Sequence, residues 1–238
     1  MKNNTKKYLK YAIGEIVLVV IGILIALQIN NWNEANKQEK QEVALLNQVK
    51  TDITINSNDL ESLIESLKVS NYSVDSVLVA IKKKTFKPRT SIFYSILHGK
   101  LFLNNINTGY RRIETSFGST IKNDTILNSI IELYEIDFDN SLTFQEQMHS
   151  LIDNTLYPFT NTHFEVSSTY KLNFEGFDDG QKNFFQPIDL ENISNNNTFK
   201  NILFQLKQTS ENRLKHCEMV KSKINNLISK IDSEIESR

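Results

Sequence analysis

The chain has 238 residues, and its 27 basic and 28 acidic residues give a net charge of −1. Hydrophobic residues make up 39% of the sequence, which is enough for a buried core and excludes a disordered polyelectrolyte. The single cysteine excludes an intramolecular disulfide framework and a multi-cysteine metal site, and the 7 glycines and 3 prolines argue against an all-β fold with many turns.

The strongest signal is an apolar segment near the N-terminus. Residues 12–29 carry a single charge, Glu15, and residues 16–27 are apolar without interruption. A helix of this length spans about 27 Å, close to the thickness of the hydrocarbon core of a bilayer. We therefore expect a transmembrane helix over residues 12–30. A buried helix of a soluble core is the less favoured alternative, because the segment is apolar on all faces.

The flanks of this segment predict its orientation. Four lysines precede it without any acid, and no basic residue follows it until Lys37. Because positive charge stays on the cytoplasmic side, the N-terminus should be cytoplasmic and residues 31–238 should lie outside the cytosol. Tyr8, Tyr11 and Trp32 stand where aromatic side chains anchor a helix at the two membrane interfaces.

A cleaved signal peptide is the rival interpretation of this segment. It would need a short apolar core followed by a small-x-small cleavage site. Residues 26–31 offer no such site, and the apolar run is longer than a usual signal core. We therefore favour an uncleaved signal-anchor.

Small residues and one acid are candidate packing positions on the predicted membrane helix. Gly22 and Ala26 form a small-x-x-x-small pattern, which allows close helix approach and which Gly14 could support. Glu15 lies in the first turn of the span, where it either reaches toward the head groups or contacts a partner helix.

The rest of the chain is weakly acidic. Four lysines and Glu15 precede residue 31, so residues 31–238 keep 23 basic and 27 acidic residues, a net charge of −4. Such a body binds phosphate poorly, and we do not expect a nucleic-acid partner.

A seven-residue apolar repeat predicts one long helix that continues the membrane helix outward as a stalk. The repeat consists of Leu46, Ile53, Leu60, Leu67, Val74 and Ile81, supported by Val49, Leu63 and Val77. The run of lysines at 82–84 should end this helix, and Pro88 forbids its continuation.

Further helices are expected along the chain. Short ones are predicted over residues 92–97 and 108–116, and a long one that Asn123 or Asp124 caps should run to Pro158. The apolar positions of this long helix are Leu127, Ile131, Tyr134, Phe138, Leu142, Met148, Ile152 and Leu156. A last long helix should follow a turn and cap at residues 195–198, with apolar positions from Phe199 to Ile235.

Residues 158–193 differ in composition from the rest of the body. They hold two of the three prolines and many aromatic residues. We interpret them as a connector with a short strand pair around residues 164–174, which serves as a packed cover or a binding loop. The predicted fold is all-α: one N-terminal transmembrane helix, a stalk and an antiparallel bundle of long helices with this aromatic-rich connector.

The opening KYAIGEIVLVVIGILIALQINNWNE, residues 10–34, resembles that of an uncharacterised family of single-pass membrane proteins from flavobacteria and related Bacteroidota. A weaker likeness covers Tyr110, Ile113, Ser116, Gly118, Ile121, Asn123, Leu127 and Tyr134. The resemblance implies an inner-membrane protein with a cytoplasmic tail (1–11), a transmembrane helix (12–30) and a periplasmic helical-bundle domain (31–238). It implies no catalytic residue, and its pattern around Glu15 and Trp32 hints at a role for the membrane end.

No pattern of catalytic or metal-ligating residues stands out. His98, His149, His163 and His216 form no H-E-x-x-H motif, which excludes the helical zinc motif. His216 precedes Cys217, but neighbours on a helix point about 100° apart, so a nucleophile–base pair is not expected. The segment that begins at Asp137 lacks the glycine of a calcium loop and has Met148 where the bidentate glutamate belongs. Glu175, Asp178 and Asp179 could contact a cation weakly, but we favour an acidic surface turn. We therefore expect no catalytic residue, no cofactor, no metal and no enzymatic activity.

Three functions remain open, in this order. The first is a non-enzymatic, membrane-anchored module that binds a partner protein or associates with itself through its helices. The second is a sensor-like ectodomain that binds a small ligand and signals through a partner. The third is an enzyme of unknown type.

Overall fold

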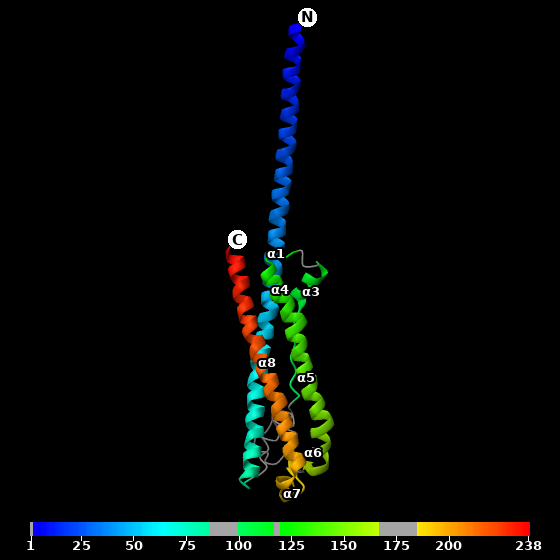
Figure 1. Ribbon diagram of the computed structural model, residues 1–238, viewed down its shortest axis with the longest axis vertical. Coiled ribbons are helices and arrows are strands. Elements are labelled where there is room, and N and C mark those ends of the chain that lie inside the picture. The colour runs from blue at the N-terminus through cyan, green and yellow to red at the C-terminus, as the bar shows by residue number, and fades with distance from the viewer. Residues whose placement is uncertain (1, 86–99, 117–119, 167–184) are drawn as a thin grey trace, which may run out of the picture.

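The computed structural model describes the backbone of residues 2–85, 100–116, 120–166 and 185–238, and the side chains of these residues except 2–12, 166, 185 and 186. The described chain is helical apart from one short two-stranded sheet, so the predicted all-α fold is confirmed. Helices pack side by side into a long bundle, and the N-terminal part of the first helix projects alone from it (Figure 1). The helix expected over residues 92–97 lies outside the described residues.

Helix α1, Lys2–Lys82, is one uninterrupted helix of 81 residues. At 1.5 Å per residue it is about 120 Å long. The predicted seven-residue repeat is confirmed as its buried seam, because Leu46, Ile53, Leu60, Leu67, Val74 and Ile81 are all buried, as are Val49, Leu63 and Val77. The membrane-type segment and the core of the bundle therefore belong to the same helix.

The lysines that end α1 form a Schellman motif. The Lys84 N–H donates to the Ile81 carbonyl, and the Thr85 N–H donates to the Ala80 carbonyl. This motif places Lys84 in the left-handed region at φ 55°, a position that glycine usually takes because it has no Cβ to clash.

Helix α8, Asn197–Glu236, runs antiparallel to α1 along the bundle (Figure 1). Asn196 caps it by accepting a hydrogen bond from the Phe199 N–H, so the predicted turn and cap are confirmed. The ion pairs that join the two helices include Lys50–Asp232, Glu61–Lys221 and Asp75–Lys207. Along α1 the paired residues are 11 and then 14 residues apart, and along α8 they are separated by the same intervals in the reverse direction. The ion pairs therefore fix the antiparallel register of the two helices.

The third column is a continuous helical run. It comprises α4 (Asp124–Glu132), the π-helix η1 (Leu133–Phe138), α5 (Asp139–Leu151), the π-helix η2 (Ile152–Leu156) and α6 (Tyr157–His163). Asn123 caps α4 as expected, but the prediction that Pro158 ends the helix was wrong. The π segment η2 precedes Pro158, and the helix continues through this proline as α6.

The π segments also change which side chains face the core. Ile131 and Leu142, two of the predicted apolar positions, are exposed, and Ile126, Ile130 and Leu133 are buried instead. A π segment adds a residue to its turn, so a 3.6-residue pattern read across it loses phase.

Helix α3, Thr108–Thr115, and the extended residues 100–107 are tied to α1 by polar side chains. The buried Asp52 accepts a hydrogen bond of 2.6 Å from the Gly109 N–H. Asn56 pairs with the backbone of Ile106, donating to its carbonyl and accepting from its N–H, both at 2.8 Å. These bonds satisfy backbone groups that a segment without regular structure would otherwise bury unpaired.

The end of the bundle far from the N-terminus contains β1 (Phe164–Val166), β2 (Phe185–Pro187) and α7 (Leu190–Asn195). The strands pair antiparallel, with Phe164 opposite Pro187. The expectation of a strand pair was correct for the first strand only, because the second strand lies beyond residue 174. The sequence pattern around one strand does not specify which distant segment will pair with it. The cover or binding loop expected within 158–193 falls mostly on residues 167–184, outside the described residues.

The core consists of two apolar clusters along the bundle axis. One contains Leu46 to Leu67 of α1, and the other contains Val74 to Ile81. Buried polar side chains lie at or near the level between them on three helices: Ser70 and Ser73 on α1, Ser141 on α5, and Ser210 and Arg213 on α8. The bundle therefore has a polar layer at its middle.

Candidate functional site: the membrane helix and the polar groups of the bundle

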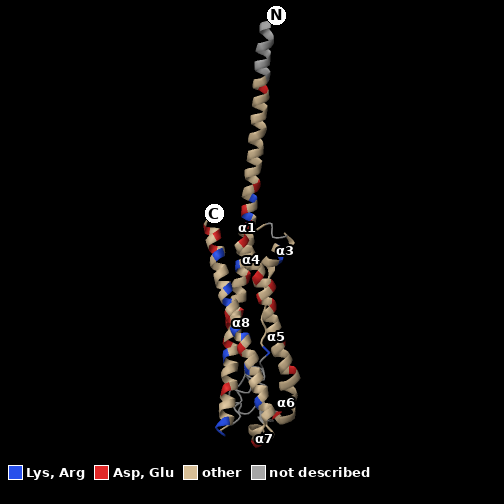
Figure 2. Ribbon diagram, viewed as in Figure 1, with Lys and Arg blue, Asp and Glu red and all other residues tan. Residues whose placement is uncertain are grey.

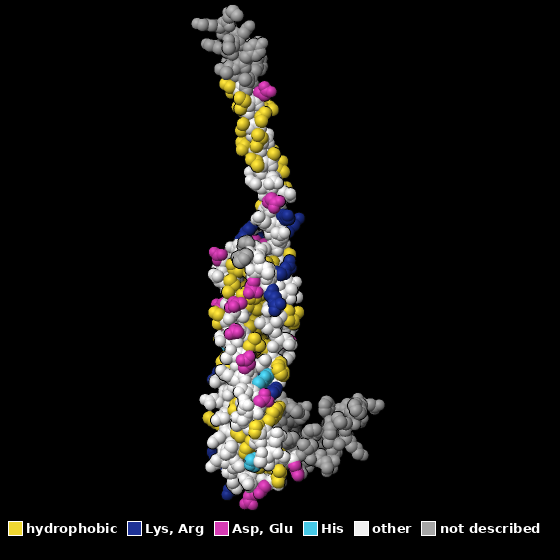
Figure 3. All heavy atoms as spheres, turned by 90° about the vertical axis from the view of Figure 1, so that its right-hand side faces the viewer, with side chains coloured by type: hydrophobic (Ala, Val, Ile, Leu, Met, Phe, Trp, Pro, Cys, Tyr) yellow, Lys and Arg dark blue, Asp and Glu magenta, His cyan; other side chains and the backbone are white. Residues whose placement is uncertain are grey.

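The projecting part of α1 exposes an apolar cylinder. Its twelve large apolar side chains, from Ile13 to Ile29, are each about half exposed or more, and none is covered by the described chain. Figure 3 shows this as a band of hydrophobic side chains around the free helix, and Figure 2 shows that charges are nearly absent from it. This part of α1 is long and apolar enough to span a membrane.

The four candidate packing residues all lie on this exposed part. Glu15, Gly22 and Ala26 project from the same side of the helix, because their separations of seven and four residues are close to whole turns. A Cβ added at Gly14 or Gly22 would meet nothing within 4 Å, so both glycines are open to an approaching helix. Their packing role stays a prediction.

The aromatic anchors flank the apolar cylinder. Trp32 follows it and is largely exposed, as an interfacial side chain would be. The side chains of Tyr8 and Tyr11 lie outside those described. The anchoring role of the three residues stays a prediction.

A polar junction holds α1 where it enters the bundle. Glu42 is fully buried and accepts hydrogen bonds of 2.7 Å from the Lys122 N–H and from Arg238 Nη1. Arg238 Nη2 donates to Glu234, which also accepts from Asn123 Nδ2 at 2.7 Å. The junction thus joins α1, the start of α4 and the end of α8.

Hydrogen bonds keep the junction ionised. Burial alone raises the pKa of Glu42, but the bonds from Arg238 and Lys122 outweigh it and hold that pKa below 4.5. Bonds from Asn123 and Arg238 likewise lower the pKa of Glu234. The sequence alone did not identify Glu42 as a buried residue. The seven-residue row of Val49 and Asn56 continues back to Glu42, and this was the available signal.

Arg213 is a buried cation in the polar layer. Its Nη2 donates to the Leu101 carbonyl at 2.9 Å and to Gln145 Oε1 at 3.3 Å. Its Nε and Nη1 have no hydrogen-bond partner, and neither has Ser210 Oγ one turn away. Within the described residues no carboxylate pairs with Arg213, and burial lowers its pKa. The sequence signal for it was its place seven residues before the buried Val220.

The described histidines interact with backbone carbonyl groups. His149, His163 and His216 each lie within hydrogen-bond distance of a backbone carbonyl oxygen, those of Leu101, Phe159 and Asp137 respectively. Among the described residues no group of three or more His, Cys, Asp or Glu could hold a metal ion. His98, Glu175, Asp178 and Asp179 lie outside those residues.

Two nucleophile candidates have the wrong surroundings for catalysis. Cys217 is buried, and its desolvation raises the pKa of its thiol to about 11. Ser141 Oγ lies 3.0 Å from His216 Nε2, but Nε2 is also 3.0 Å from the Asp137 carbonyl. A carbonyl only accepts, so Nε2 carries the proton and cannot act as a base toward the serine.

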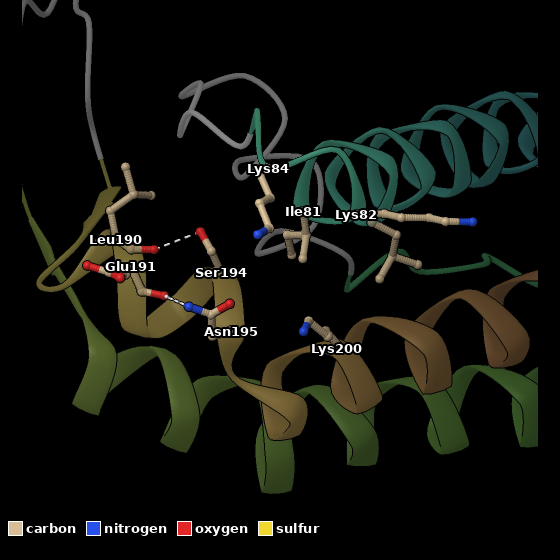
Figure 4. A pocket seen from close by; sticks show the side chains of 9 residues that line it. Ile81, Lys82, Lys84, Leu190, Glu191, Ser194, Asn195 and Lys200 are labelled. Carbon is tan, nitrogen blue, oxygen red and sulfur yellow. Dashed lines mark hydrogen bonds between the residues drawn. The ribbon is translucent and has the colours of Figure 1, made fainter.

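A half-open cleft of about 850 Å³ lies at the far end of the bundle from the N-terminus. It is lined by the last turns of α1, by α7 and by the first turn of α8 (Figure 4). Its lining residues are Leu78, Ile81, Lys82, Lys84, Leu190, Glu191, Ser194, Asn195 and Lys200. Cationic and aliphatic side chains therefore share one concave surface.

No curated protein matches the chain significantly, and no solved structure does. One protein family does match it, over residues 15–179, which is more than half of the chain. The match covers most of the apolar cylinder, the rest of α1 and the column from α4 to α6. The protein therefore belongs to the family of unknown function DUF6090.

Proposed function

We propose that the protein is a membrane-anchored helical module that binds a partner protein or a second copy of itself and catalyses no reaction. One observation carries the proposal. The same helix, α1, is bare and apolar over residues 13–29 and buried in the bundle over residues 45–81. The anchor and the binding body are therefore parts of one rigid rod, with no linker between them.

The exposed apolar cylinder supports the membrane anchor energetically. Removing a Val, Leu or Ile side chain from water gains roughly 1.5–3 kcal/mol, so twelve of them favour the bilayer by on the order of 20 kcal/mol. The four lysines of the N-terminal tail, with no base beyond the span until Lys37, support a cytoplasmic N-terminus and a periplasmic bundle in the inner membrane.

The bare stalk supports partner binding. Residues 30–41 are mostly exposed and include several asparagines, which are poor helix formers. This stretch of α1 has little tertiary packing, which supplies most of the stability of helices in proteins. A helix from a partner or from a second copy would cover this stretch and stabilise it.

Membrane insertion and orientation are tested together. Full-length protein should stay with the membrane after alkaline carbonate extraction, and a C-terminal alkaline phosphatase fusion should be active while a C-terminal green fluorescent protein fusion stays dark. Ile21→Lys with Leu24→Lys should release the protein. On the scale of membrane insertion the two central lysines cost about 5–7 kcal/mol, and the ten remaining Val, Leu and Ile side chains regain only about 0.3–0.6 kcal/mol each. The matched pair Gln38→Lys with Gln41→Lys, on exposed stalk positions, should remain inserted. Full-length protein in the soluble fraction would refute the anchor.

Partner binding is tested by site-specific photo-crosslinking in native membranes. A photoreactive residue at Trp32 should give one discrete crosslinked species, and mass spectrometry of it would distinguish a second copy from a different protein. The control places the same residue at Ser66, an exposed position on the bundle. Equal, diffuse crosslinking at both positions would contradict stalk-mediated binding.

A ligand-binding ectodomain is the second candidate function, and the cleft at the far end of the bundle is the observation that favours it. A volume of about 850 Å³ suits a small-molecule ligand. A signal from such a ligand would pass through α1, whose last turns line the cleft.

A further inference from the structure

The cleft at the end of α1 combines two inward-pointing cations with an aliphatic floor. Figure 4 shows the side chains of Lys84 and Lys200 extending toward the same space from α1 and α8. Leu78, Ile81 and Leu190 are the large apolar residues of the lining. Within the described residues, neither lysine is paired with a carboxylate.

The other polar side chains of the cleft either point away from the space between the two lysines or are hydrogen-bonded to their own helix. The Glu191 carboxylate points away from both ammonium groups in Figure 4, and Lys82 points out of the cleft. Ser194 Oγ donates to the Leu190 carbonyl and Asn195 Nδ2 to the Glu191 carbonyl, so both are bound to their own helix. An anion that enters the cleft therefore meets two cations and no facing acid among the described residues.

Both lysines occupy positions where the local backbone disfavours lysine. Lys84 takes the left-handed position of the Schellman motif, where glycine avoids steric cost. Lys200 lies in the first turn of α8, which contains no acid, although the helix dipole favours negative charge there. Lys82, by contrast, suits the dipole at the C-terminal end of α1. Two local conflicts that converge on one cleft are typical of a binding site.

We propose that this cleft binds a small amphiphilic anion, with an oxyanion head group between Lys84 and Lys200 and a short apolar body over Leu78, Ile81 and Leu190. The head group would form charge-assisted hydrogen bonds with the two ammonium groups, and the apolar body would remove the aliphatic lining from water. The site lies at the opposite end of the molecule from the apolar cylinder (Figure 1), so it depends neither on anchoring nor on the stalk. It names the ligand class that the second candidate function requires.

The test is equilibrium dialysis of the full-length protein in lipid nanodiscs against labelled hexanoate and labelled hexyl phosphate. At least one of them should bind saturably, with one site per chain. Hexan-1-ol and inorganic phosphate should each bind at least tenfold more weakly, because each lacks one half of the recognised chemistry. Binding of hexanol or of inorganic phosphate as tight as that of the amphiphilic anions, or no saturable binding, would overturn the proposal.

Three variants assign the binding to the cleft. Lys84→Gly and Lys200→Gln should each weaken binding by about tenfold, the effect of losing one charged hydrogen bond. Lys84→Gly should also raise the melting temperature, because glycine suits the left-handed position, so its loss of binding cannot come from unfolding. Lys83→Gln changes an exposed lysine that does not line the cleft; it is the matched control and should bind as the wild type does. Equal binding by the Lys84 and Lys200 variants and the wild type would place the ligand elsewhere and refute the site.

Discussion

Gly109→Ala tests the close contact between α3 and α1. A Cβ at this position would lie 2.8 Å from Val49 Cγ2, 2.9 Å from its backbone nitrogen and 3.0 Å from its Cα. Two of these atoms are backbone of the longest helix in the bundle, so they cannot move aside as the end of a flexible side chain can. The α3 segment must shift instead, and this would lengthen the 2.6 Å bond between the Gly109 N–H and Asp52.

The expected cost follows from these two effects. Overpacking of a buried contact costs about 1–3 kcal/mol, and weakening a hydrogen bond to a buried carboxylate adds part of a further ~1.5–3 kcal/mol. We expect Gly109→Ala to lower the free energy of unfolding by about 2–4 kcal/mol. For a chain of this size that corresponds to a melting temperature roughly 5–12 °C lower.

The assay is thermal unfolding of full-length protein in nanodiscs, followed by far-ultraviolet circular dichroism. Gly22→Ala is the matched control, because a Cβ there meets nothing within 4 Å, and its melting temperature should not fall below that of the wild type. A Gly109→Ala protein that melts within about 1 °C of the wild type would show that α3 does not approach α1 this closely.

Three further predictions concern the buried ionisable groups. The folded-state pKa of Glu42 is depressed, so its stabilising effect is present above about pH 4.5 and is lost as the pH falls through the lower folded-state pKa. In Glu42→Gln the melting temperature should therefore fall less between about pH 7 and about pH 3 than it does in the wild type. An unchanged slope would contradict the junction with Arg238. Arg213→Met should change stability in urea unfolding by less than about 1 kcal/mol or increase it, because no buried counterion is left unpaired, and a loss above ~3 kcal/mol would reveal a missing partner. The Cys217 thiol, with its pKa raised to about 11 by burial, should resist a thiol-reactive disulfide reagent at pH 8 until urea unfolds the bundle, and fast labelling of folded protein would refute its burial.

The sequence predicted the parts of the fold that repeat locally. The seam from Leu46 to Ile81 was correct at every position, because six apolar residues at intervals of seven over about ten turns leave one face to bury. The caps at Asn123 and Asn196 were also correct, since an asparagine just before an apolar helix satisfies free N–H groups whatever packs nearby.

The wrong predictions concern positions whose structure depends on contact with a distant segment of the chain. The π segments shifted the phase at Ile131 and Leu142, and they let the helix pass Pro158. The second strand lies at residues 185–187 because its pairing partner, not its own pattern, selects it. Such choices depend on contacts between segments far apart in the chain, which a local periodicity does not contain.

The candidate sites divide in the same way. Composition alone determined that residues 13–29 form a helix suited to a bilayer, because an unbroken apolar run needs no knowledge of its neighbours. Only the tertiary structure showed that Glu42 is buried against Arg238, that Arg213 lacks a counterion, and that Lys84 and Lys200 share a cleft. The physical reason is that hydrophobicity belongs to each residue, whereas the partner of a charge is decided by which helices the fold brings together.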